Sequence, residues 1–247
     1  MTTESITAVI FDWDFTLVYT IGKDVAYDER TTMMLNQIGI PCSLQDVQQA
    51  QQAQLADVQN GVIALPTYPQ TKPDFLQIYR DLLTRLGVTE VDEALVYKLY
   101  TEYARLPTFL YEDALPTLQA LHNCGFRLGI LSNHTTSVRA TIEPFVGHFI
   151  PAEQILISEE AGLHKPEPGI YKQAAERVHT PPQQCVYVGD NLHVDAIGAV
   201  QLGGFAHGFW VDRKGTGQGQ TFPANVTRIT QLTELIDLLE HGYPTAM

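Results

Sequence analysis

The amino-acid sequence predicts an α/β protein with a doubly wound, mostly parallel, Rossmann-like sheet and an inserted four-helix domain. Three observations support this prediction. A short apolar run at residues 8–11 precedes a pair of acidic residues. From residue 107 onward, short apolar segments alternate with amphipathic segments of helical period, which is the pattern of strands joined by helical crossovers. Residues 19–106 between these regions have helical patterning and are too many for a loop.

The first element is a buried strand at residues 8–11, because the run is short and wholly apolar. The insert at residues 19–106 follows, and its helices are marked by capping residues at their starts and glycines at their ends. Ser43 begins a capping-box pattern ahead of a glutamine-rich helix, whereas Gly39 and Gly87 end the helices before them. The expected helices of the insert span residues 24–38, 43–59, 74–86 and 89–105.

Pro107 marks the change to alternating strands and helices, so the core domain is expected to comprise residues 1–18 and 107–247. The expected strands of this second part span residues 126–131, 154–158, 185–189 and 205–211. The expected helices span residues 114–123, 137–144, 169–179, 194–202 and 230–240. Because strands and helices alternate, the sheet is expected to be mostly parallel.

The bulk composition excludes several classes of protein. The 247 residues have a formal net charge of −13 and a pI near 4.9, which argues against a nucleic-acid binder. No apolar stretch has the length of a membrane span, and the N-terminus lacks the pattern of a signal peptide. Cys42, Cys124 and Cys185 are far apart and form no C-x-x-C pair, which favours free thiols in a reducing compartment. We therefore expect a soluble cytoplasmic protein without nucleic-acid or membrane partners.

Two carboxylates, Asp12 and Asp14, directly follow the first strand, and Thr16 lies two residues further on. Acidic side chains after a core strand are costly unless a ligand or a reaction uses them. The alternative is an ordinary polar turn in which Asp14 caps the following segment. This segment alone leaves both interpretations open.

The later strands also end in polar residues. Ser132 and Asn133 end the second strand, and Lys165 follows the third. Asp190 ends the fourth strand, with Asp195 five residues beyond it. Taken singly, each has an ordinary interpretation as a helix cap or a solvated charge. Because the carboxyl ends of parallel strands meet at one edge of a sheet, we expect these side chains to lie together where such folds bind ligands.

These four segments resemble the motifs of the haloacid dehalogenase (HAD) superfamily, specifically its phosphatase-like members with a helical cap inserted after the first motif. The matches are D-x-D-x-T at residues 12–16, the strand-terminal Ser132, Lys165 followed by proline, and G-D-x-x-x-x-D at residues 189–195. They span the whole predicted core in the family's order, whereas the insert at residues 19–106 matches only in architecture. The resemblance implies a Mg²⁺-dependent phosphatase that acts on a small phosphorylated metabolite.

The resemblance also implies a role for each catalytic residue. Asp12 is the expected nucleophile, which forms an aspartyl phosphate, and Asp14 is expected to protonate the leaving alcohol and then activate water. Lys165 is expected to offset negative charge between Asp12 and the phosphoryl group. Ser132 and the Asn133 N–H are expected to donate hydrogen bonds to the phosphoryl oxygens.

Supporting and metal-binding residues are implied in the same way. Mg²⁺ is expected on an Asp12 oxygen, the Asp14 backbone carbonyl and the Asp190 carboxylate. Thr16 is expected to orient the loop that carries the nucleophile. Asp195 is expected to hold the active-site lysine or a metal-bound water.

Two residues depart from the family pattern. Most such phosphatases have glycine where this chain has Phe15, and Trp13 is uncommon between the two aspartates. Trp13 is expected either to line the substrate cavity or to pack between core and cap, with packing favoured. His134 is a further candidate for a substrate contact because it follows Ser132 closely, although a structural role is the commoner one for such a histidine.

Several functions share this fold. The family's dehalogenases and phosphonatases lack an acid at the position of Asp14, so phosphoryl transfer is the expected chemistry. A phosphomutase or phosphotransferase of the same superfamily has the same motifs, and a non-catalytic binding protein on this fold is a third alternative. The sequence identifies neither the phosphorylated substrate nor the oligomeric state.

Overall fold

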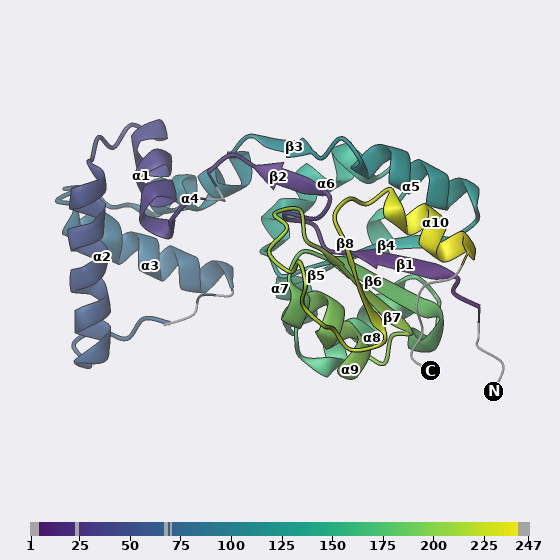
Figure 1. Ribbon diagram of the computed structural model, residues 1–247. Coiled ribbons are helices and arrows are strands. Elements are labelled where there is room, and N and C mark those ends of the chain that lie inside the picture. The colour runs from purple at the N-terminus through teal and green to yellow at the C-terminus, as the bar shows by residue number, and fades with distance from the viewer. Residues whose placement is uncertain (1–4, 23–24, 67–68, 70, 242–247) are drawn as a thin grey trace. The chain divides into compact units, whose positions relative to one another are not determined.

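The computed structural model describes residues 5–22, 25–66, 69 and 71–241, and Figure 1 shows its elements. Within these residues the main sheet has six strands, all parallel, in the order β5–β4–β1–β6–β7–β8. The strands are β1 (Ala8–Phe11), β4 (Arg127–Ser132), β5 (Ile155–Ile157), β6 (Cys185–Gly189), β7 (His207–Val211) and β8 (Val226–Ile229). The predicted doubly wound α/β fold with a helical insert is confirmed.

Strand β1 is central and fully buried, with β4 on one side and β6 on the other. Its side chains alternate between two hydrophobic cores, as the period of two in a strand requires. Val9 and Phe11 pack in the core that includes α5 (Ala114–Asn123) and Leu235 of α10 (Glu234–His241). Ala8 and Ile10 pack in the core that includes α8 (Pro168–Arg177). Figure 1 shows α5 and α10 on one side of the sheet and α8 on the other.

The remaining helices of this region are short. They are α6 (Arg139–Val146), α7 (Ser158–Ala161) and α9 (Gly198–Gln201). The helix expected at residues 194–202 begins instead as a π-helical turn, Leu192–Ile197, which continues directly into α9. Single π-helical turns are frequent at functional sites.

Three strands have no counterpart among the predicted elements. Strand β8 is short, and its two central residues, Thr227 and Arg228, are only half-buried, so its sequence lacks a continuous apolar run. The other two, β2 (Val18–Thr20) and β3 (Thr108–Leu110), have three residues each and form a separate two-stranded sheet. Segments this short carry too little periodicity to be distinguished from loops.

The chain divides into two compact units, which we name the core unit (residues 1–19 and 109–247) and the helical unit (residues 20–108). The helices of the helical unit are α1 (Tyr27–Gln37), α2 (Leu44–Gln59), α3 (Lys72–Arg85) and α4 (Glu93–Glu102). Residue 24, the expected start of the first of them, lies outside the described residues. Among the described residues, every helix is too short or too polar to traverse a lipid bilayer.

Capping residues explain where the helices of this unit begin. Ser43 and Asp46 satisfy each other's backbone N–H groups in a complete capping box at the start of α2. Thr71 and Asp74 do the same for α3. A hydrophobic core that includes Leu35, Leu82 and Leu99 lies between the helices. The glutamine-rich sequence of α2 therefore forms an ordinary amphipathic helix rather than a low-complexity segment.

Candidate active site

The core unit gathers the predicted residues at the carboxyl ends of three neighbouring strands. Asp12 follows β1, Ser132 ends β4 and Asp190 follows β6. The strands are adjacent and parallel, so their C-terminal ends share one edge of the sheet. The chain turns to opposite sides of β1 when it forms β4 and β6, and ligands of doubly wound sheets bind at such a reversal.

Lys165 is the centre of this cluster, and its ammonium group is buried. Its Nζ atom donates to Asp12 Oδ1 at 2.7 Å and to Asp195 Oδ1 at 2.7 Å. The third hydrogen bond runs to the hydroxyl of Tyr187 at 2.9 Å. That hydroxyl in turn donates to the carbonyl of Leu131 at 2.7 Å. All three protons of the lysine are therefore engaged, and its position is fixed by four chain segments.

Burial and neighbouring charges both shift the pKa values of these groups. Burial alone would lower the pKa of Lys165, but Asp12 and Asp195 outweigh it and raise that pKa well above its usual value. Burial raises the pKa of the Asp12 carboxyl, and Lys165 opposes this shift. Burial, and after it the charge of Asp195, raises the pKa of Asp190 to about 6. The cluster holds more negative charge than its one ammonium group balances.

A divalent cation would correct this imbalance. Oxygen atoms of Asp12, Asp190 and Asp195 lie within 4.8 Å of one another. Both oxygens of Asp195 already accept hydrogen bonds, one from Lys165 and one from the Asn191 backbone at 2.9 Å. Asp12 and Asp190 are therefore the side chains that could hold a metal. An all-oxygen donor set with excess negative charge fits Mg²⁺.

Gly189 allows Asp195 to reach the lysine. A Cβ atom at this position would lie only 2.4 Å from the carboxyl group of Asp195. Any larger residue would push that carboxylate away from Lys165. The glycine before Asp190 in the G-D-x-x-x-x-D pattern thus has a packing reason in this chain.

Ser132 and Asn133 lie beside the cluster. Ser132 is buried at the end of β4. The Asn133 side chain makes two hydrogen bonds to the backbone of Lys165. Asn133 Nδ2 donates to the Lys165 carbonyl at 2.9 Å, and the Lys165 N–H donates to Asn133 Oδ1 at 2.8 Å. Asn133 therefore fixes the lysine loop, a contact that the sequence did not indicate. Its predicted backbone contact with a phosphoryl group stays a prediction.

Asp14 faces a histidine. Its Oδ2 atom is 4.0 Å from Nε2 of His134, whose side chain is almost fully buried. The backbone of His134 is anchored by Ser158, whose Oγ accepts from the His134 N–H at 3.0 Å and donates to the His134 carbonyl at 3.1 Å. The structure thus places His134 beside the predicted general acid, on a fixed backbone.

The turn between the two aspartates and β2 is strained. Phe15 has a φ of 59°, in the left-handed region that favours glycine. Such a conformation costs a residue with a side chain on the order of 1–3 kcal/mol. Thr16 is fully buried, and its hydroxyl has no hydrogen-bond partner among the described residues.

Trp13 is buried in the hydrophobic core of the core unit, where its ring centroid lies 6.4 Å from that of Phe145.

Two residues that contact the site are not predicted by the sequence. Tyr187 lies in the middle of β6, where an aromatic residue indicates only core packing. Trp210 ends near the site because its Nε1 donates to the carbonyl of Asp190 at 2.8 Å. In both cases the body of the side chain is in the core and only its polar tip reaches the site, as aromatic residues with a polar atom often do.

Comparison with known proteins assigns the family. A family model of the haloacid dehalogenase-like hydrolases matches residues 6–203, and the chain belongs to this family. A glyceraldehyde 3-phosphate phosphatase from Methanopyrus kandleri is 36% identical over 128 residues. That match covers 49% of this chain and 53% of the relative, so the chain spans about half of that protein's length.

Solved structures agree on the fold. The 2-haloacid dehalogenase from Pseudomonas syringae superposes with a TM-score of 0.64 at 22% identity, covering 96% of this chain and 99% of the other. The HAD hydrolase YfnB from Bacillus subtilis, bound to magnesium, has a TM-score of 0.63 at 19% identity and covers 96% and 100%. At these identities the likeness shows the fold alone.

Proposed function

We propose that the protein is a Mg²⁺-dependent phosphatase that hydrolyses a small phosphomonoester through an aspartyl-phosphate intermediate. One observation carries the proposal: a buried lysine bridges Asp12 and Asp195 at 2.7 Å, with Asp190 beside them at the edge of the sheet. This arrangement concentrates charge around a carboxylate at the place where doubly wound folds bind ligands.

Asp12 is the nucleophile of the proposed reaction. One of its carboxylate oxygens attacks the phosphorus atom, and the bond from phosphorus to the alcohol oxygen breaks. Lys165 keeps Asp12 in place and offsets the charge that accumulates as two anions approach. Ser132 and the Asn133 N–H donate hydrogen bonds to the phosphoryl oxygens.

Asp14 moves the protons. It gives a proton to the leaving alcohol in the first step, then takes one from the water that attacks the aspartyl phosphate. Its place on the turn directly after the nucleophile suits this task, and its Oδ2 atom faces His134 at 4.0 Å. The free carboxylate of Asp12 is regenerated when inorganic phosphate leaves.

Asp12, Asp190 and the backbone carbonyl of Asp14 would hold Mg²⁺. When bound, Mg²⁺ would neutralise charge on the phosphoryl oxygens. Asp195 has a different duty, since its two oxygens hold Lys165 and the Asn191 backbone. Trp210 fixes the Asp190 loop by its hydrogen bond to that residue's carbonyl.

Asp14 favours phosphatase over dehalogenase activity. An alkoxide is a poor leaving group and needs a proton, whereas a halide leaves without one. A carboxyl at position 14 therefore has a leaving group to protonate in ester hydrolysis and none in dehalogenation. A phosphotransferase remains the second candidate, because it uses the same residues and differs only in whether water or an alcohol accepts the phosphoryl group.

The substrate class is a small phosphorylated metabolite, in keeping with the glyceraldehyde 3-phosphate phosphatase among the relatives. The test is a panel of glyceraldehyde 3-phosphate, phosphoglycolate, sugar phosphates and nucleoside monophosphates, with phosphate release measured with Mg²⁺ and with excess chelator. We expect release from at least one compound, dependent on Mg²⁺ and lost in Asp12→Asn. Halide release from 2-haloacids without phosphate release from any ester would contradict the proposal. Transfer to an added sugar in preference to water would favour the phosphotransferase.

A further inference from the structure

The turn that carries both catalytic aspartates is held in a conformation its sequence disfavours. Phe15 is left-handed, with a φ of 59°. Backbone hydrogen bonds close the turn. The Phe15 N–H donates to the Val18 carbonyl at 2.7 Å, and the Trp13 carbonyl accepts from the Leu17 N–H at 3.0 Å and the Val18 N–H at 3.2 Å. A non-glycine residue in this region persists only where the surrounding structure overdetermines it. Contacts from outside the turn must therefore contribute.

One side chain from a distant segment supplies such a contact. Arg213, two residues beyond β7, donates from Nη2 to the carbonyl of Thr16 at 2.9 Å. This carbonyl belongs to the residue directly after the left-handed Phe15. Because Arg213 and Thr16 both belong to the core unit, the contact lies within one compact body.

Two further residues fix the guanidinium. Asp113 accepts from Nη1 and Nη2 of Arg213, each at 2.9 Å, in a bidentate pair. The ring of Tyr111 lies 3.7 Å from the guanidinium carbon. The Tyr111 N–H also donates to the Leu17 carbonyl at 3.0 Å. The arginine and the residue stacked on it thus contact consecutive carbonyls of the same turn.

We propose that Arg213 is a positioning residue of the active site, which holds the strained turn so that Asp12 and Asp14 keep their places. The inference rests on the proposed function for its catalytic readout. Arg213 is more than 15 residues outside every motif of the family, and it touches no predicted catalytic side chain. It acts through the backbone of Thr16. A rigid planar fork suits this task, because the same group must accept Asp113 on one side and reach a carbonyl on another.

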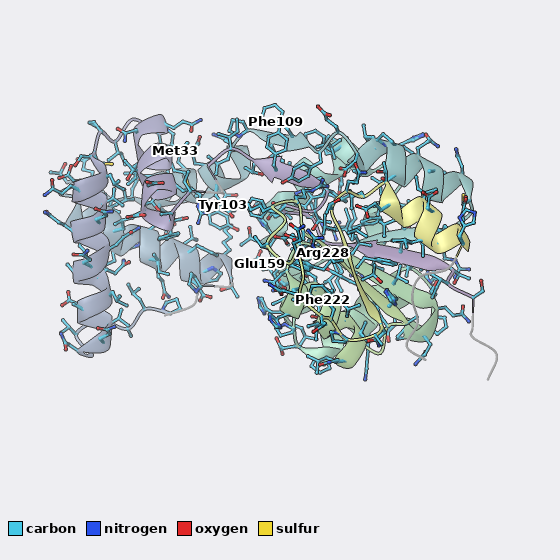
Figure 2. All side chains as sticks on the ribbon, viewed as in Figure 1. Met33, Tyr103, Phe109, Glu159, Phe222 and Arg228 are labelled. Carbon is cyan, nitrogen blue, oxygen red and sulfur yellow. The ribbon has the colours of Figure 1, made fainter. Side chains whose placement is uncertain are left out.

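The first experiment compares Arg213→Lys and Arg213→Gln with Arg228→Gln. Arg228, labelled in Figure 2, is the matched control: it also pairs with an aspartate of the core unit, Asp212, at 2.7 Å, and among the described residues its side chain has no hydrogen bond or ion pair to the turn. We expect both Arg213 variants to lose between about tenfold and about a hundredfold in kcat, with KM for a generic aryl phosphate changed by less than about threefold. Arg228→Gln should keep kcat within about threefold of wild type at equal folded fraction. Equal kcat in Arg213→Lys and wild type would overturn the proposal.

The second experiment asks whether the arginine acts by holding the left-handed residue. Glycine adopts this conformation freely, whereas alanine does not. In a Phe15→Gly background, Arg213→Lys should cost less than about threefold in kcat. In a Phe15→Ala background, which also lacks the ring, the loss should match that in the Phe15 protein. A merely structural role predicts the same loss in all three backgrounds, and that result would overturn the proposal.

Hydrogen exchange separates this proposal from the proposed function. The amide of Leu17 should exchange faster by at least about tenfold in Arg213→Lys and at an unchanged rate in Arg228→Gln. This holds whether or not the wild-type protein hydrolyses a phosphomonoester. If wild type is inactive on every ester but the exchange prediction holds, the proposed function fails and the positioning contact stands. Unchanged exchange at Leu17 would refute the positioning contact itself.

Discussion

The core unit buries two groups of acidic side chains that differ in one respect, the ratio of carboxylates to donors. Asp212, just after β7, is a single carboxylate with several donors: the backbone N–H groups of Thr216 and Gly217, the Thr216 hydroxyl and the guanidinium of Arg228. The cluster of Asp12, Asp190 and Asp195 has three carboxylates around one ammonium group.

The pKa values follow this ratio. Burial would raise the pKa of Asp212, but hydrogen bonds from Gly217 and Arg228 outweigh it and lower the pKa below its usual range. Burial raises the pKa of Asp12 and that of Asp190, and the neighbouring carboxylates add to the shift. Burial of an acid is therefore not in itself a sign of function.

A cluster of acidic side chains that serves a function is distinguished by having too few hydrogen-bond donors from the protein. Asp212 fastens a glycine-containing turn, and its charge is fully compensated by the protein. The three clustered acids keep an uncompensated charge, which reduces the stability of the metal-free protein and can be used by a cation or a phosphoryl group. The following substitutions test this distinction.

Asp12→Asn should abolish turnover, with a loss in kcat of at least about a thousandfold, because an amide is not a nucleophile for phosphorus. Hydrolysis of an aryl phosphate with Mg²⁺ measures this. Asp212→Asn is the matched comparison, since it makes the same chemical change at a buried aspartate of the same unit. It should keep kcat within about tenfold of wild type for the folded fraction. Equal losses in the two variants would remove the distinction between the groups.

Asp212→Asn should instead lower the free energy of unfolding by about 2 kcal/mol, because a half-buried guanidinium and two N–H groups lose part of their acceptor. Urea denaturation followed by fluorescence measures this change. Asp237→Asn, at an exposed carboxylate on α10, serves as the control and should change stability by less than about 0.5 kcal/mol. An Asp212 variant as stable as the control would show that its donors contribute nothing.

Asp190→Asn should have opposite effects in two conditions. In excess chelator the melting temperature should rise by about 2–4 °C, corresponding to about 1 kcal/mol, because one uncompensated charge leaves the cluster. Mg²⁺ should stabilise wild type by mass action and stabilise the variant much less. Thermal unfolding with and without Mg²⁺ gives both values. A variant that gains as much from Mg²⁺ as wild type does would exclude Asp190 from the metal site.

The protonation of His207 has the smallest predicted effect at neutral pH, and it gives the fold a pH dependence outside both groups. Burial lowers the pKa of this β7 histidine to about 4. Between pH 6.5 and about 4, the His207 imidazole binds a proton in the unfolded chain but not in the folded chain. The free energy of unfolding therefore falls as the pH falls through this range. The loss should reach roughly 2–3 kcal/mol. His207→Gln should reduce the slope in urea denaturation across this range, and an unchanged slope would contradict the prediction.

The sequence was sufficient to predict the parts of the site that lie at strand ends. Asp12, Ser132 and Asp190 each follow an apolar run, and parallel strands must bring such ends to one edge of the sheet. Lys165 was predictable from its motif rather than from physics, because a lone lysine after a strand has no distinctive pattern. The predicted roles of these residues await the experiments above.

The contacts that fix the site could not be predicted, because their partners are remote in sequence. Arg213 is 197 residues from Thr16 and 100 from Asp113. Tyr187 lies in an apolar strand, and nothing in that strand shows that its hydroxyl meets a lysine. Likewise, the sequence flagged Phe15 as unusual without revealing its left-handed backbone. Such features depend on tertiary packing rather than on local pattern.

The proposed role of Asp12 as the nucleophile in phosphoryl transfer can be tested by trapping the intermediate. The protein is mixed with Mg²⁺ and a phosphomonoester that it hydrolyses, the reaction is stopped with acid before turnover is complete, and peptides are analysed by mass spectrometry. We predict one added phosphoryl group on the peptide that contains Asp12, and none in Asp12→Asn. Product formation with no phosphorylated peptide, or with the phosphoryl group on another residue, would contradict the claim.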